Sequence, residues 1–173
     1  MRIKIFLISF FLGSTVYASP VIVLPDKPDM LAFPAGETQA YAADFLNRHL
    51  ERATGRKLKI IREKDAAKFQ ERIFIGSTAA ALRIIGNPGQ MEPETLIVRS
   101  DGKDLFLCGE MTEDRVDRGT LFAVYEYLER ALGIRWYFPD DPRIHPDGFG
   151  VIIPGNRNLR LDGWNIRDWP RLR

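Results

Sequence analysis

The stretch GEMTEDRVDRG, residues 109–119, concentrates carboxylates at a spacing that could support hydrolytic chemistry. Glycoside hydrolysis needs a pair of carboxyl groups, and the candidates for a self-sufficient hydrolase are Glu110, Glu113 and Asp114. A structural interpretation is favoured, because acids just before a helix interact with its dipole and Asp117 is placed to cap one. We therefore expect a solvated, self-paired loop and assign no catalytic residue.

Two histidines are the candidates for metal binding. His145 lies in the loop PDDPRIHPDG beside Asp140, Asp141 and Asp147, but a proline-rich loop lacks the fixed i, i+4 geometry that a helix gives a metal site. His49 falls on the apolar face of an expected helix, which is typical of a histidine satisfied in the core or at its rim. No metal ligand is predicted.

The remaining reactive groups do not indicate a cofactor. Cys108 is the single cysteine and lies in the apolar run DLFLCG, so we expect a small buried side chain and no internal disulfide. The stretch GSTAAALRIIG, residues 76–86, places a hydroxyl at a helix start but has no lysine at phosphate-loop spacing. Neither a nucleotide site nor another cofactor site is expected.

Four aromatic residues are the candidates for contact with a sugar ring or a neighbouring module. Trp136 and Tyr137 are adjacent on an expected strand, so they face opposite sides, one toward the core and the other outward. Trp164 and Trp169 lie in a polar C-terminal segment, where tryptophans are exposed unless a partner covers them.

The elements that must position these groups follow from hydrophobic period and turn residues. Helices are expected from Glu37 to Gly55, from a Ser77 cap to Gly86, and from an Asp117 cap to Gly133. Strands are expected at 21–24, 58–61, 72–76, 134–139 and 149–154, with a hairpin over 94–109 that turns at Asp101-Gly102 and one further short strand at most, at 159–163. The alternation predicts an α/β (α+β) domain whose mixed sheet is packed by about three helices in two or three layers.

Residues 1–18 read as a signal peptide, because Arg2 and Lys4 precede a short apolar run and small residues stand before a cut ahead of Ser19. We therefore expect export to the periplasm or the extracellular space, with no membrane attachment once the leader is removed. Arg2 and Lys4 also account for the formal charge of +2, and the balanced charge of the remainder argues against a nucleic-acid partner.

The order of four segments resembles a known domain. ETQAYAADFLNRHLERATGRKLKI, RIFIGS, ETLIVRSDGKDLFLCGE and RGTLFAVYEYLERALGIRWYFPDD together look like the N-terminal domain of α-glucuronidases and bacterial β-N-acetylhexosaminidases, the chitobiase domain-two-like superfamily. The resemblance covers about residues 20–170, and its most specific part is 118–139.

The resemblance implies a hexosaminidase domain-two-like fold and a non-catalytic role. In that superfamily a phrase similar to DWPRLR precedes a (β/α)₈ barrel that carries the catalytic acids. It implies an accessory domain at 19–155 and an exit segment at 156–173 leading to a C-terminal barrel of an exported glycoside hydrolase. The alternative is a free-standing sugar-binding module that uses its exposed aromatics.

Overall fold

The computed structural model describes residues 19–27, 38–111, 117–137, 150–155 and 157–169. Its main helices are α1 (Thr38–Thr54), α2 (Ala79–Ile85) and α3 (Arg118–Leu132), with short 3-10 turns η1 (Glu63–Lys68) and η2 (Pro88–Gln90). Its strands are β1 (Val21–Leu24), β2 (Lys59–Arg62), β3 (Arg72–Ile75), β4 (Leu96–Asp101), β5 (Asp104–Gly109), β6 (Arg135–Trp136), β7 (Val151–Ile152) and β8 (Asn165–Asp168). The expected α/β alternation is confirmed.

Six strands form one mixed sheet in the order β2-β1-β3-β5-β4-β8. The first four are mutually parallel, whereas β4 runs antiparallel to both β5 and β8, so β8 runs in the direction of the parallel strands. All four residues of β1 are buried, as a central strand covered on both faces requires. The strands β6 and β7 pair separately as a two-stranded ribbon.

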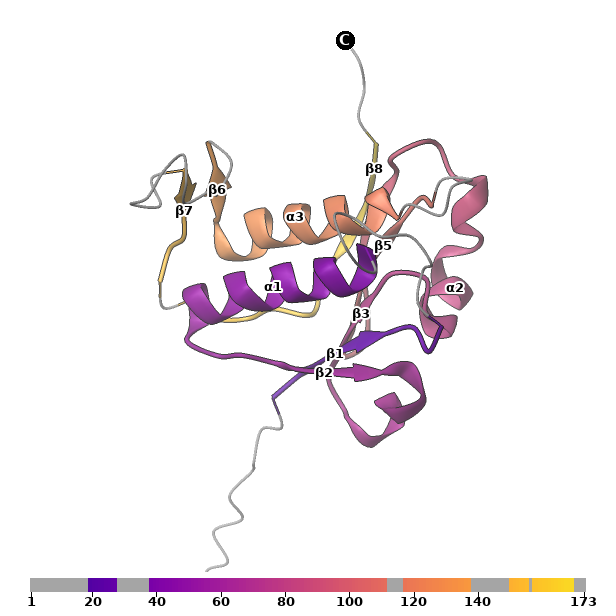
Figure 1. Cartoon of the computed structure of the whole chain (residues 1–173), viewed down its shortest axis with the longest axis horizontal. Helices are drawn as coiled ribbons and strands as arrows, with labels where there is room; N and C mark the ends of the chain where they lie inside the picture. The colour runs from indigo at the N-terminus through magenta and orange to yellow at the C-terminus, as the bar shows by residue number, and fades with distance from the viewer. Residues whose placement is uncertain (1–18, 28–37, 112–116, 138–149, 156, 170–173) are drawn as a thin grey trace, which may run out of the picture.

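Helices α1 and α3 lie side by side across one face of the sheet (Figure 1). Their apolar stripes meet alternate residues of the strands, as the two-residue period of a strand demands. The larger core therefore lies between this helix pair and the sheet, and its largest wholly buried members include Leu46, Leu50, Leu128, Leu132 and Tyr127.

A smaller core covers the opposite face, so the domain has three layers. Phe74 and Phe106 stack there with ring centroids 5.0 Å apart, and α2 and η1 contribute Ala81 and Ala66. At the amino end of the same strands, Arg72 donates two hydrogen bonds to the carboxylate of Asp104. This ion pair lies at the edge of the smaller core and links β3 to β5.

Glycine brings α3 unusually close to the sheet. A Cβ placed on Gly109, at the end of β5, would lie 2.1 Å from the Thr95 carbonyl oxygen, and one on Gly119 would lie 2.3 Å from the same atom. The backbones are linked in series, since Glu110 N–H donates to Thr95 and Gly119 N–H donates to Glu110. A side chain at either glycine would have to push α3 away from β5.

Most expected elements are confirmed, although the strands expected at 134–139 and 149–154 are only Arg135–Trp136 and Val151–Ile152 in the described residues. Four further differences concern single residues or positions. Thr78, rather than Ser77, caps α2, because its hydroxyl accepts from Ala81 N–H. Leu82, whose apolar side chain and place in the helix next to buried Ala81 predict burial, is instead 40% exposed, since a helix of under two turns buries only a narrow stripe. The hairpin turns at Gly102-Lys103 instead of Asp101-Gly102, because Asp101 still pairs with Asp104.

The fourth difference concerns the C-terminal segment. Its strand is Asn165–Asp168 rather than the expected 159–163, and it pairs with β4 along four residues. The sequence pattern predicts no strand at 165–168, and for these residues that expectation is wrong. A polar run without periodicity is a weak strand signal, but the open edge of β4 supplies the hydrogen-bond partners that the sequence does not reveal.

The stripe of α3 can be tested by comparing two leucines. Leu128 is wholly buried between α3 and the sheet, so Leu128→Ala is expected to lower the free energy of unfolding by about 2 to 5 kcal/mol through lost burial and a cavity. Leu82→Ala, on an exposed helix position, should cost less than about 1 kcal/mol. Denaturant unfolding followed by circular dichroism measures both, and equal losses would contradict the described packing.

Candidate functional site

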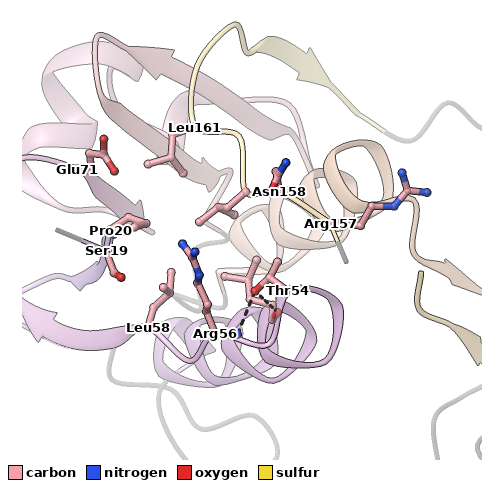
Figure 2. A pocket seen from close by; sticks show the side chains of 11 residues that line it. Ser19, Pro20, Thr54, Arg56, Leu58, Glu71, Arg157, Asn158 and Leu161 are labelled. Carbon is pink, nitrogen blue, oxygen red and sulfur yellow. Dashed lines mark hydrogen bonds between the residues drawn. The ribbon is translucent and has the colours of Figure 1, made fainter. Parts of the chain in front are cut away.

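A hollow on the described surface lies at the amino edge of the parallel strands, with a volume of about 430 Å³ (Figure 2). Its walls come from the start of β1, the C-terminal end of α1, the start of β3 and the segment 157–161. Leu50, Leu58, Leu159 and Leu161 give it an apolar lining, while its polar side chains include Arg56, Glu71 and Asn158. A volume of this order is typical of small-molecule sites.

The end of α1 aims Arg56 at this hollow. Gly55 takes a φ of +72°, which a non-glycine residue rarely adopts, and its N–H donates to Glu51 to close the helix. Arg56 N–H then donates to the hydroxyl of Thr54, 3.2 Å away. Figure 2 shows the guanidinium of Arg56 between Pro20 and Asn158.

Asn47 fixes the floor of the hollow. Its amide donates to the carbonyl of Leu58 and accepts from the N–H of the same residue, both at 2.8 Å. Asn47 is buried, and its side chain pairs with both backbone groups of Leu58 as a neighbouring strand would. These two hydrogen bonds fix the connection between α1 and β2. Leu58 is thereby buried against the end of α1.

The opposite wall is held by a carbonyl that accepts two hydrogen bonds. The hydroxyl of Tyr127 donates to Arg160 O at 2.8 Å, and the indole N–H of Trp164 donates to the same oxygen at 3.0 Å. The two rings pack edge to face with centroids 5.4 Å apart. Ser100 exchanges hydrogen bonds with the backbone of Trp164, which attaches the segment to β4 as well.

The charged groups around the hollow are not mutually neutralised. Neither Arg56 nor Glu71 makes a side-chain hydrogen bond or ion pair within the described part of the chain. An adjoining hollow of about 320 Å³ shares Glu71 and adds Lys103. Arg157 contributes less, because its side chain extends away from the hollow in Figure 2.

The carboxyl edge of the sheet, by contrast, is filled by a buried polar network. The amide of Gln39 donates to Asp117 at 2.7 Å, and Asp117 also caps α3 by accepting from Thr120 N–H. A Cβ on Gly76 would lie 2.5 Å from the Gln39 amide nitrogen, so glycine there leaves the room that Gln39 occupies. Gln39 Oε1 and Thr120 Oγ1 have no hydrogen-bond partner among the described residues, and both are buried.

The predicted pair Trp136 and Tyr137 faces opposite sides, as expected. Trp136 packs among Phe45, His49 and Tyr125, with its ring centroid 5.4 Å from that of Tyr125. Tyr137 is 63% exposed on the outer side of the β6–β7 ribbon. Only Tyr137 of the two therefore offers a free ring face.

The tail tryptophans also differ from one another. Trp164 is half-buried against Tyr127 and the larger core, so its ring is covered by its own domain. Trp169 follows β8 and is 39% exposed. The expectation of an exposed indole is wrong for Trp164, because Tyr127 covers it from a helix distant in sequence.

The acids and histidines do not converge within the described residues. Glu110 is buried and accepts from Glu94 N–H at 3.1 Å, which is a structural role. Its proposed partners Glu113 and Asp114 lie outside the described residues, as does His145 with the aspartates around it. His49 is buried, with Nδ1 at 2.8 Å from Phe45 O, as expected for a core histidine.

Burial raises the pKa of the Cys108 thiol, with the nearby negative charge of Asp117 as a smaller cause. A thiol held neutral is a poor nucleophile, which agrees with the buried structural role expected for it. Among the described residues, no cluster of three metal-ligating side chains occurs. In the same part of the chain, no helix is long and apolar enough to span a bilayer.

Compared with known proteins, the chain matches no family model and no curated sequence. The hollow at the amino edge is the site that sequence reasoning missed. Its one local signal is Thr54-Gly55-Arg56, a helix end followed by an arginine, and that pattern alone does not tell which surface the arginine faces.

The alkaline stability of the chain tests the Tyr127 contact. Burial raises the pKa of Tyr127 above its ordinary value of 10.0. The phenol therefore ionises at lower pH in the unfolded chain than in the folded one. Its contribution to the free energy of unfolding is fully present below about pH 10 and is lost as the pH rises further. Tyr127→Phe should cost about 1 kcal/mol at neutral pH and reduce the alkaline loss by up to about 1.4 kcal/mol per pH unit.

Denaturant unfolding across a pH series measures both effects, with Tyr137→Phe as the exposed control. Burial also raises the pKa of Tyr125, so some alkaline loss persists in the variant. An unchanged slope above pH 10 in Tyr127→Phe would show that this phenol does not carry the effect.

Proposed function

We propose that this chain is the non-catalytic N-terminal α/β accessory domain of an exported, carbohydrate-active glycoside hydrolase of the α-glucuronidase or β-hexosaminidase kind. The domain-wide resemblance motivates the proposal. The observation that carries it is β8, because this strand pairs with β4 and ends at Asp168, the first residue of the phrase that resembles the one before a barrel. A following domain attached there is held by a strand rather than by a loose linker.

The corner where β8 ends has the features of a contact surface. Trp169 is exposed next to β8, and Leu96 pairs with Asp168 at the start of β4. Just before β4, Glu94 has a φ of +60°, the only non-glycine residue described with a positive φ. Its N–H is held by the buried carboxylate of Glu110, and strain maintained in this way is frequent at functional positions.

The proposal assigns the chemistry to the partner domain. Within the described residues, the two acids of the cluster, Glu110 and Asp117, are both buried and both have structural partners. Glu110 accepts from Glu94 N–H, while Asp117 accepts from the amide of Gln39 and from Thr120 N–H. Retaining and inverting glycosidases both require two carboxyl groups across the scissile bond. We therefore favour a supporting role for this domain over a hydrolase that acts on its own.

The size of the exported protein tests the proposal. Antibodies raised against this chain should detect a secreted or periplasmic polypeptide well above 19.8 kDa, since a (β/α)₈ barrel adds about 250 residues. That polypeptide should hydrolyse aryl glycosides, whereas the chain of residues 1–173, exported and purified, should not. A native product no larger than this chain would count against an attached barrel.

Tyr137 favours the alternative, a free-standing sugar-binding module. Its ring is 63% exposed, and an exposed aromatic face is a usual platform for a sugar ring. The neighbouring Ile152 is 54% exposed on the same side of the ribbon, which extends the surface but adds no polar group. This alternative predicts that chito- or xylo-oligosaccharides bind the isolated chain, whereas the accessory-domain proposal predicts no such binding at Tyr137.

A further inference from the structure

We propose that the hollow at the amino edge of the sheet is a binding site for a small anion that carries several hydroxyl groups. The inference goes beyond the accessory role and does not require a following domain. It rests on the lining of the hollow, which holds a guanidinium and a carboxylate that are unpaired within the described ranges, together with a side-chain amide and an apolar floor.

The guanidinium of Arg56 selects the anion. It lies between Pro20 and Asn158 in Figure 2, and it has no ion-pair partner within the described residues. A planar guanidinium presents parallel N–H groups that match a carboxylate or a phosphate in two hydrogen bonds. The hydrogen bond from Arg56 N–H to the Thr54 hydroxyl holds the backbone of Arg56 in place. Binding a ligand therefore costs side-chain entropy at Arg56 but little backbone entropy.

The other polar groups select hydroxyls. Glu71, at the start of β3, offers carboxylate oxygens that accept from hydroxyl groups, and its backbone is held by Val21 N–H. Asn158 offers both a donor and an acceptor. The leucine floor suits the carbon skeleton of a polyol, and a volume of about 430 Å³ accommodates a ligand of sugar size.

The surrounding charge favours an anion over a cation or a neutral polyol. Lys103 lines the adjoining hollow near Glu71 and also lacks a partner among the described residues. The expected removal of the leader places the α-amino group of Ser19 on the same wall. Arg160 and Asp162 of the adjoining hollow pair with each other, so their charges cancel. The two cations Arg56 and Lys103 and this α-ammonium then outweigh the negative charge of Glu71, which favours a positive potential in the hollow.

Titration of the exported protein with four probes tests the inference, with backbone amide shifts followed by NMR. Gluconate and glucose 6-phosphate both carry an anion and hydroxyls, and their relative affinities tell which anion the site prefers. Glucitol keeps the hydroxyls without the charge, and acetate keeps the charge without the hydroxyls. We expect at least one of the first two to bind about tenfold or more tightly than either control and to shift the amides of Arg56, Leu58 and Leu159.

Two charge-removing variants localise the binding. Arg56→Gln should weaken the preferred anion about tenfold or more, because its charge-assisted bonds are lost. Arg83→Gln removes the same charge from the exposed side of α2, on the other face of the sheet, and should leave the affinity unchanged. Melting temperatures of both variants confirm that each is folded.

Three results would overturn the inference. The first is no shift of the lining amides by either hydroxylated anion. The second is equal affinity for acetate and the hydroxylated anions, which would mean a charge effect without a site. The third is an equal loss of affinity in Arg56→Gln and Arg83→Gln, which would mean that binding depends on the net charge of the protein and not on the hollow. None of these results bears on the length of the exported protein, so the accessory-domain proposal stands or fails separately.

Discussion

The close approach of α3 to β5 is the constraint on which the rest of the domain depends. Two glycines, Gly109 and Gly119, allow the helix start and the strand end to meet around the Thr95 carbonyl. Because α3 is seated this deeply, Tyr127 is wholly buried and its hydroxyl reaches Arg160. The segment that closes the amino-edge hollow and then forms β8 is thus positioned by a backbone contact at the other end of the helix.

The two ends of the sheet have been used in opposite ways. Parallel α/β sheets usually place ligands beyond the carboxyl ends of the strands, where helix N-termini gather. Here the network of Gln39, Asp117 and Thr120 fills the described part of that end with side chains sealed from solvent. The open, partly charged hollow lies instead at the amino end, where Arg56 and Glu71 remain available. A buried polar network favours a unique arrangement of the helices, whereas an open hollow leaves room for a ligand.

The C-terminal segment combines an anchored part with an exposed part. Trp164 is covered by Tyr127 and bonded to Arg160, so the segment belongs to the domain up to β8. Beyond β8, Trp169 is 39% exposed, and Glu94 with its positive φ stands just before the paired strand β4. This corner is the surface that we propose for contact with a partner domain. In this proposal the hydrogen bonds of β8 leave little freedom for a hinge, so a domain that follows β8 would keep a fixed orientation relative to the sheet.

Local sequence determined most of the elements. Helix α3 with its Asp117 cap and Gly133 stop, and the C-terminal end of α1 at Gly55, are set by neighbours a few residues apart, and both were found where expected. The hairpin over β4 and β5 was also found, with its turn one residue later than expected. The opposite orientations of Trp136 and Tyr137 also followed from adjacency alone. Tertiary structure decided the rest, because the partners are distant in the chain. The free edge of β4 turned residues 165–168 into a strand, Tyr127 covered Trp164, and the meeting of four segments created a hollow around Arg56. Such pairings depend on which backbone groups and ring faces the folded sheet leaves unfilled, and no periodicity within a segment carries that information.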